Sequence, residues 1–358
     1  MTRVRGWMCA ALLAALSTMA MAQETAPKPP ELTADQKAEV MKSISDIIAR
    51  RVFVSGADLS QWPKYVEKHQ SSIDSATSPR GFMSAVNRAF REFGFSHIRL
   101  KLQTTTTPTK PASPPDPVST PPFWLQEPSR PAPQERKNSV TWVDTETAVL
   151  KLYSFSQGYQ TKEISELAKE AAKAKYLLVD LRSNGGGATT NLRHFLSLLM
   201  PPDTEIGAFI SKRDAETFLE KNEGTQVDLN KIAESKTRKY KTFKMEQPPF
   251  SGKIAVLVNR GSASASEICA AALKEQRGAL IFGSRTAGAV LASVTSKLPH
   301  GFELQFPVSD YITAKGKRLE DSPIEPDFPV TGRTGDSDPV VAKAVEVLKT
   351  PSASIAKP

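Results

Sequence analysis

Two short apolar runs, 176–181 and 253–258, constrain the fold of this 358-residue chain more than any other feature. Neither run alternates with polar residues in a regular way, which is typical of strands that are buried on both faces. Each run leads through a turn of small residues into a pattern with helical spacing, over about 189–200 and 264–276. Buried strands that alternate with helices predict an α/β fold with a central sheet that is mainly parallel.

The N-terminus has the organisation of a cleavable signal peptide over residues 1–22. Arg3 and Arg5 form a short basic start, an apolar run follows over 8–21, and a small-x-small motif ends at Ala22. The apolar run is too short to cross a bilayer, which takes about 20 residues. We therefore expect export with cleavage after Ala22 and a periplasmic or secreted protein, with an uncleaved N-terminal anchor as the alternative.

Charge and cysteine content limit the other options. Cleavage would lower the formal net charge of +9 by two and leave Cys269 as the one cysteine, so the mature chain cannot form an internal disulfide. Cys269 lies in an Ala-rich helical pattern and is predicted to be buried. Basic residues are interspersed with acidic ones, and no nucleic-acid motif or metal-ligand spacing occurs. The sequence therefore predicts no metal, no cofactor and no nucleic-acid partner.

The first part of the mature chain, 23–95, is predicted to form a small helical subdomain. A capping-box pattern begins at Thr33, and apolar residues follow at helical spacing over 34–52. Further helices are predicted over about 60–70 and 79–93. Residues 96–102 alternate like a strand.

A proline-rich stretch over 103–138 separates this part from the remainder, with ten of the 27 prolines of the chain. We predict a flexible linker there, because proline interrupts both helices and strands. The core is predicted over 139–335, with 207–245 charged, irregular and partly helical, and a C-terminal helix and tail over 336–358. Additional core elements are expected as strands at 140–143, 148–153, 279–283, 291–298 and 302–308, and as a helix at 161–174.

The segment from Asn259 to Glu267, Asn-Arg-Gly-Ser-Ala-Ser-Ala-Ser-Glu, joins a predicted strand to a predicted helix. A serine at such a junction can face a cleft, and the free N–H groups of the helix N-terminus suit an oxyanion. Serine is also a common helix cap, so the pattern alone leaves a catalytic and a structural interpretation open.

A second glycine-rich turn, Asp-Leu-Arg-Ser-Asn-Gly-Gly-Gly from Asp180 to Gly187, also joins a strand to a helix. Its backbone amides could donate to a substrate carbonyl. Asp180, Arg182 and Asn184 are expected to brace the loop. No Lys-Ser/Thr pair follows and the dinucleotide spacing is missing, which argues against phosphate binding.

A nucleophilic serine needs a base, and the chain has four histidines. His69 falls in a polar helix and is predicted to lie on the surface. His194 lies within a helix and is expected to pack or to be half-exposed, and His300 occupies a turn. His97 opens a strand beside the helical subdomain, where a cleft could form, and is therefore the candidate base.

Four motifs together resemble the C-terminal processing (tail-specific) peptidase family: 180–187, Ser262 to Glu267, Gly283-x-x-Thr-x-Gly288, and Pro326-Asp327. The resemblance covers about 148–330. It implies a crotonase/ClpP-like ββα core, a nucleophile at Ser264, and oxyanion donors at the backbone N–H groups of Ala265 and Gly187.

The chain departs from the Ser/Lys members of that family. Where they carry a catalytic lysine this chain has Ala289, and Lys274 and Lys297 are displaced. It is instead similar to the tricorn-core branch, which uses a Ser-His-Ser-Glu tetrad. That similarity assigns Ser96 and His97 to the tetrad. Glu320 fills the acidic position, with Glu325 as the fallback.

The resemblance thus implies a serine endopeptidase that hydrolyses extended or unfolded polypeptides through an acyl-enzyme, with a pH profile that reports His97 near neutrality. Many relatives carry a PDZ module where this chain has 103–138, an interval too short and too rich in proline for one. A non-catalytic ligand- or peptide-binding protein is the main alternative, because the retinoid-binding protein of the eye resembles this core. An acyl-CoA hydratase of the crotonase type is a further alternative, which the predicted export disfavours. The oligomeric state stays open.

Overall fold

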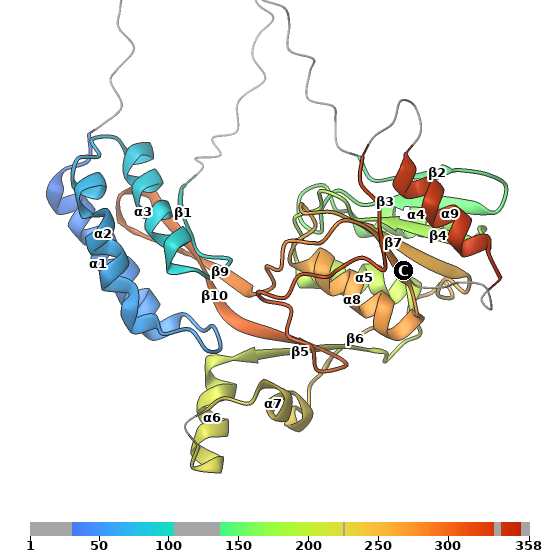
Figure 1. Ribbon diagram of the computed structural model, residues 1–358. Helices are drawn as coiled ribbons and strands as arrows, with labels where there is room; N and C mark the ends of the chain where they lie inside the picture. The colour runs from blue at the N-terminus through green and yellow to red at the C-terminus, as the bar shows by residue number, and fades with distance from the viewer. Residues whose placement is uncertain (1–30, 104–136, 225, 333–337, 352–358) are drawn as a thin grey trace, which may run out of the picture.

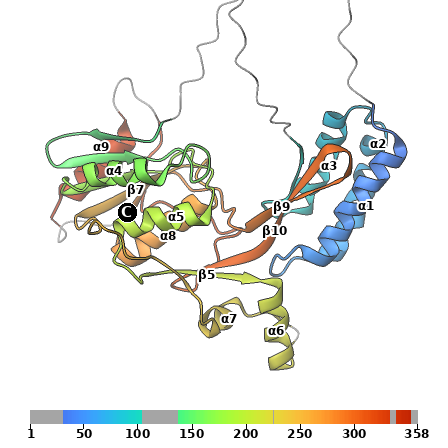
Figure 2. The ribbon, with the colours of Figure 1, turned by 180° about the vertical axis from the view of Figure 1, so that it is seen from behind.

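The computed structural model describes residues 31–103, 137–224, 226–332 and 338–351 of the chain. The predicted signal peptide over 1–22 and most of the predicted linker lie outside these residues. Helices near the N-terminus form one side of the molecule, and a mixed α/β core forms the other (Figures 1 and 2). None of the helices described is long and apolar enough to cross a membrane.

The N-terminal helices pack on one face of a five-stranded sheet. Thr33 closes the predicted capping box at the start of the first helix. Val40, Ile44 and Phe82 are fully buried and share an apolar cluster with Phe302 of the sheet. The helical elements here are α1 (Ala34–Arg51), the 3-10 turn η1 (Leu59–Gln61), α2 (Trp62–Asp74) and α3 (Pro79–Phe93).

The five-stranded sheet joins the helical side to the core. Its order is β1-β10-β5-β6, and β9 pairs with β10 as an additional strand. All of its pairings are antiparallel. Its strands are β1 (Arg99–Leu102), β5 (Glu205–Ser211), β6 (Tyr240–Lys241), β9 (Ala292–Lys297) and β10 (Phe302–Thr313). Figure 1 shows the long β10 running between the N-terminal helices and the core.

The six-stranded sheet has the order β11-β8-β7-β4-β3-β2. Every pairing from β3 to β11 is parallel, and β2 pairs antiparallel to β3. These pairings confirm an α/β fold whose central sheet is mainly parallel. The strands are β2 (Ser139–Trp142), β3 (Thr147–Lys151), β4 (Tyr176–Asp180), β7 (Lys253–Val258), β8 (Leu280–Gly283) and β11 (Phe328–Pro329).

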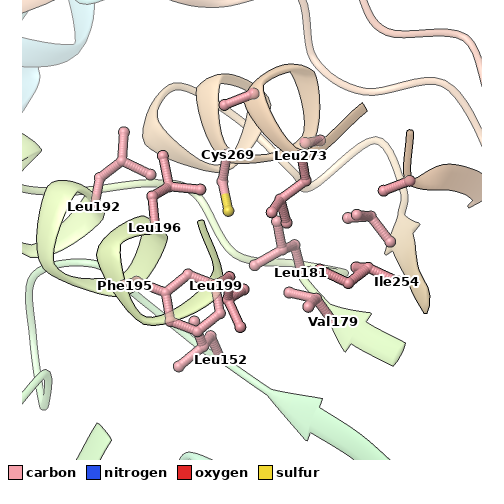
Figure 3. Close-up of a cluster of buried hydrophobic side chains, with 14 of the residues drawn as sticks. Leu152, Val179, Leu181, Leu192, Phe195, Leu196, Leu199, Ile254, Cys269 and Leu273 are labelled. Atoms are coloured by element: carbon pink, nitrogen blue, oxygen red, sulfur yellow. The ribbon is translucent and has the colours of Figure 1, made fainter. Parts of the chain in front are cut away.

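Helices cover both faces of this sheet. On one face, α4 (Thr161–Ala171), α5 (Thr189–Leu199) and α8 (Ala265–Arg277) enclose the largest apolar cluster. Figure 3 shows Cys269 of α8 among the leucines of α5 and the strand residues beneath them. On the other face, α9 (Pro339–Lys349) packs against β4, β7 and β8. Both runs that end in glycine- or serine-rich turns, β4 and β7, are adjacent strands, so the turns that follow them meet at one edge.

The expectation that 207–245 is partly helical is confirmed, but the stretch is more regular than expected, because it also contains strands. This stretch holds most of β5, then α6 (Lys212–Asn222), α7 (Leu229–Ser235) and β6. Ser211 and Asp214 form a capping box at the start of α6. Strand β5 pairs with β10, about 100 residues later in the chain. Such a long-range pairing cannot be predicted from the local sequence.

Candidate active site

Ser264 lies at the junction between β7 and α8 in an unusual backbone conformation, with φ 57° and ψ −120°. A non-glycine residue with positive φ is strained and persists only where its surroundings hold it. Here the Ser264 N–H donates to the carbonyl oxygen of Ala289 at 3.0 Å. The strained turn points the half-buried serine into a cavity instead of into the helix.

Glu267 fixes this turn from within the protein. Its side chain is fully buried. One carboxylate oxygen accepts from Thr286 Oγ1 at 2.5 Å and from Gly288 N at 2.8 Å. The other accepts from Ala289 N at 3.0 Å and Ser264 N at 3.1 Å. A single carboxylate therefore ties the nucleophile turn to the Thr286–Ala289 turn.

His97 lies in the loop between α3 and β1, also with positive φ, at 62°. The strand predicted to begin at residue 96 starts at Arg99, so His97 lies in a turn before the strand. His97 Nε2 is 3.1 Å from Ser264 Oγ, and His97 Nδ1 is 2.6 Å from Ser96 Oγ.

Glu320 follows the turn after β10 and is only 1% exposed. Its carboxylate accepts from Ser96 N at 2.9 Å, from Ser96 Oγ at 2.9 Å and from Val290 N at 2.6 Å. The fallback, Glu325, is exposed. The structure thus brings Ser264, His97, Ser96 and Glu320 into one chain of hydrogen bonds.

The hydrogen bonds assign the tautomer of the imidazole. Ser96 Oγ has one proton, which it donates to Glu320. The contact between Ser96 Oγ and His97 Nδ1 then requires the proton on Nδ1. Nε2 is left as an acceptor toward Ser264, which is the state that a general base needs.

Burial shifts the pKa values of two of these groups. It lowers the pKa of His97 to about 4, below the neutral range expected from sequence, because the imidazolium form loses hydration. Burial also raises the pKa of Glu320, an effect that hydrogen bonds from Ser96 and Val290 oppose. The resting site therefore holds a neutral imidazole at pH 7.

The glycine-rich turn lies directly against Ser264. A Cβ on Gly186 would come within 2.8 Å of Ser264 Cβ and 2.7 Å of the Ala263 oxygen. The predicted bracing is confirmed: Asn184 Oδ1 accepts from Gly186 N at 2.9 Å, and Arg182 donates to Asp180 through Nε at 2.9 Å. Only glycine at 186 allows this approach.

Among the residues described, the backbone N–H groups of Ala265 and Gly187 donate no hydrogen bond to another residue. Ala265 is the first residue of α8, where helical N–H groups have no partner within the helix. Gly187 is exposed. Both residues line the same cavity as Ser264.

This cavity has a volume of about 720 Å³ and is lined by both Ser264 and His97. Its apolar wall includes Phe209, Ile268 and Val290, and its polar wall includes Thr295 and Gln305 of the five-stranded sheet. The arrangement offers a serine, a neutral base and two amide donors around one space, which is the set of groups that acyl transfer requires.

The other histidines lie elsewhere. The prediction that His69 is on the surface is wrong, because it is only 9% exposed. Its Nε2 lies 3.1 Å from Glu92 Oε1 of α3, a tertiary contact that the polar sequence around His69 does not indicate. His194 is buried and bonds Tyr159 Oη through Nδ1 at 2.7 Å. His300 occupies the predicted turn and pairs with Glu39 at 2.9 Å.

Cys269 is fully buried, as predicted, and burial raises its thiol pKa. Sequence reasoning missed the role of Glu267, although its position three residues after Ser264 matches the Ser-x-x-Glu pattern of helix starts. No group of three or more potential metal-ligating side chains occurs among the residues described.

The profile of peptidase family S41 matches residues 146–330. The tail-specific protease of Haemophilus influenzae is 35% identical over 143 residues, which cover 39% of this chain and 17% of that protein. The chain thus spans about a third or less of the length of the curated relatives that it matches. Ser96 and His97 precede the matched segment.

Two solved structures share the fold over most of their length. A putative peptidase from Parabacteroides merdae aligns with a TM-score of 0.58 and 16% identity, over 89% of this chain and 99% of that one. A lipoprotein from Streptococcus agalactiae aligns with a TM-score of 0.56 and 17% identity, over 87% and 96%. At these identities the likeness concerns the fold alone.

Proposed function

This chain belongs to peptidase family S41, and from that premise we propose that it is a serine endopeptidase with Ser264 as nucleophile and His97 as general base. The observation that carries the proposal is the hydrogen-bond chain from Ser264 Oγ through His97 and Ser96 to Glu320. A binding protein has no need for a neutral imidazole aimed at a strained serine.

In the proposed mechanism, His97 Nε2 accepts the proton of Ser264 Oγ as that oxygen attacks a peptide carbonyl. Ser96 and Glu320 stabilise the imidazolium that forms, and the amides of Ala265 and Gly187 hold the oxyanion. The imidazolium then gives its proton to the departing amine, which leaves an acyl-enzyme. Water, deprotonated by His97, attacks the acyl carbon and releases Ser264 with its proton restored.

We propose extended or unfolded polypeptides as substrates. Ser264 is only partly exposed and lies inside a cavity, so a scissile carbonyl must enter between the glycine-rich turn and the five-stranded sheet. A flexible, extended segment can do this, whereas a peptide bond within a folded domain cannot. We further propose export with cleavage after Ala22, and a periplasmic or secreted enzyme, from the leader at 1–22. The subdomain over 23–95, the linker over 103–138 and the core over 139–335 remain part of this proposal.

The test is labelling of the protein with a fluorophosphonate probe. We expect the wild-type protein to be labelled, and Ser264→Ala and His97→Ala to lose labelling. His300→Ala is the matched control, because this histidine pairs with Glu39 away from the cavity. Glu320→Gln should slow labelling, while Glu325→Gln should not.

Folding of each variant is checked by circular dichroism. A folded wild-type protein that resists labelling would contradict the proposal and favour the non-catalytic alternative. Labelling that survives in Ser264→Ala would place the nucleophile elsewhere. Hydrolysis of an unfolded protein substrate compared with its folded form then tests the substrate class.

A further inference from the structure

The proposed active-site cavity contains one permanent charge. Among the residues that line it, Lys101 and His97 are the two with side chains that can be cationic, and none is aspartate or glutamate. Because burial lowers the pKa of His97 to about 4, the imidazole is neutral at pH 7. The ammonium group of Lys101 is then the only full charge that the lining residues present to a ligand.

The position of Lys101 on β1 explains why its side chain reaches the cavity. Leu100 is fully buried and faces the N-terminal helices. Alternation along a strand places Lys101 on the opposite face, which is the polar face of the five-stranded sheet. Thr295 and Gln305 also line the cavity from this sheet.

The surroundings of Lys101 leave its charge largely uncompensated. Its cross-strand neighbour on β10 is Glu303, and no ion pair joins the two among the contacts that the structure describes. Glu303 is also the cross-strand neighbour of Lys297 on β9, so one carboxylate lies between two ammonium groups. Glu303 itself is not part of the cavity lining. The wall therefore carries a net positive charge toward the cavity.

We propose that Lys101 is a specificity-determining residue that selects peptides with a carboxylate close to the scissile bond. The inference rests on the proposed peptidase function. The carboxylate can belong to an aspartate or glutamate side chain or to the C-terminus of the substrate, because both present the same charge and acceptor geometry. A half-buried ammonium group forms stronger ion pairs than a fully exposed one, since water and salt screen it less.

No aspartate or glutamate among the residues described lines the cavity, which should favour anionic substrate side chains and also disfavour cationic ones. Among the residues that line the cavity, an anionic substrate side chain meets one cation and no carboxylate, whereas a lysine or arginine side chain meets a cation and no anionic partner. Discrimination between substrates depends on such repulsive contacts as much as on attractive ones.

The experiment compares kcat/KM for fluorogenic peptides of one sequence that differ at a single position near the scissile bond, with Glu, Gln or Lys there. Each position from three residues before the bond to three after it is varied in turn. A second set has the cleaved bond close to the C-terminus, as the free acid or as the amide. The enzymes are wild type, Lys101→Met, Lys101→Glu and the control Lys253→Met, which alters an exposed cation at the start of β7, outside the cavity lining.

We expect wild type to prefer Glu over Gln by about tenfold at one position at least, or the free acid over the amide by a similar factor. Lys101→Met should reduce that ratio to below about twofold, and Lys101→Glu should make the Lys peptide the better substrate. Lys253→Met should leave the ratio unchanged. Whichever peptide set shows the preference identifies the source of the carboxylate.

A measurement on the wild-type enzyme avoids reliance on variants that fold poorly: the preference for the anionic peptide should fall as salt rises from low to about 0.5 M, because salt screens the pair. Equal cleavage of the Glu, Gln and Lys peptides and of acid and amide would overturn the role of Lys101 and leave the peptidase function standing. A preference that persists in Lys101→Met would do the same. No cleavage of any peptide, together with no fluorophosphonate labelling, would overturn both proposals.

Discussion

Fluorophosphonate labelling of Ser264 should persist well below neutral pH, because burial lowers the pKa of His97 to about 4. Relative to an ordinary histidine at about 6.5, the shift biases the folded protein toward the neutral imidazole by about 3 kcal/mol. At pH 5, a base with a pKa of 4 is about 90% in the competent form, whereas one with a pKa of 6.5 is about 3% competent. The labelling rate at pH 5 should thus stay near its plateau, about thirtyfold above the rate that an unshifted histidine would permit.

The assay is the initial rate of labelling between pH 4 and pH 8 at constant ionic strength, with circular dichroism at each pH to show that the protein is folded. His97→Asn, which should label too slowly to show an acid limb, identifies the limb with this residue. An acid midpoint near 6.5 in folded protein would refute the argument, because it would mean that the buried imidazole is as easily charged as one in water.

The lowered pKa of His97 also makes the stability of the protein depend on pH. The pKa of His97 is lower in the folded state than in the unfolded state, so the unfolded chain binds more protons below about pH 6.5. The free energy of unfolding is therefore not reduced by His97 above about pH 6.5. Protonation of His97 in the unfolded chain reduces it progressively as the pH falls from 6.5 toward 4. His194, whose pKa burial also lowers, acts in the same direction. Urea midpoints measured across this window should fall with pH, and less steeply in His97→Asn.

Three further changes probe how the nucleophile turn and the core are held. Glu267→Gln replaces a buried carboxylate that accepts four hydrogen bonds with an amide that also brings two donors. The free energy of unfolding, measured by urea titration, should therefore fall by about 3 kcal/mol or more. An unchanged urea midpoint would contradict this role of Glu267. Gly186→Ala should slow labelling strongly, because its Cβ would lie 2.8 Å from Ser264 Cβ, whereas Gly185→Ala, with nothing within 4 Å, should label normally. Cys269 should resist maleimide in the folded protein and react after unfolding in urea, since it is fully buried; fast modification of folded protein would show that its helix opens.

Local patterns predicted most of the helical and parallel-strand framework. The capping box at Thr33 and the apolar spacing after it gave the first helix to within a residue, because both signals act within one turn of the chain. The runs at β4 and β7 were recognisable because strands covered by helices on both faces need apolar residues throughout. Their adjacency in the sheet then brings two small-residue turns together, which is why the candidate nucleophile could be named from sequence.

Contacts between distant segments were the part that sequence could not provide. β5 begins at Glu205 and ends against a charged helix, and its stability comes from pairing with β10 rather than from its own pattern. His69 looked like a surface residue because its partner, Glu92, belongs to another helix. The low pKa of His97 has the same origin, since burial of the ring depends on how the loop that carries it packs against the core.

The order of the tetrad residues along the chain determines when a working site can exist. His97 meets Ser264 across 167 positions, and Ser96 meets Glu320 across 224. During synthesis from the N-terminus, Ser96 and His97 are therefore made long before Ser264 and Glu320. If the tetrad acts as proposed, a chain that ends before Glu320 lacks one of the four groups and the hydrogen bonds that the glutamate accepts from Ser96 and Val290.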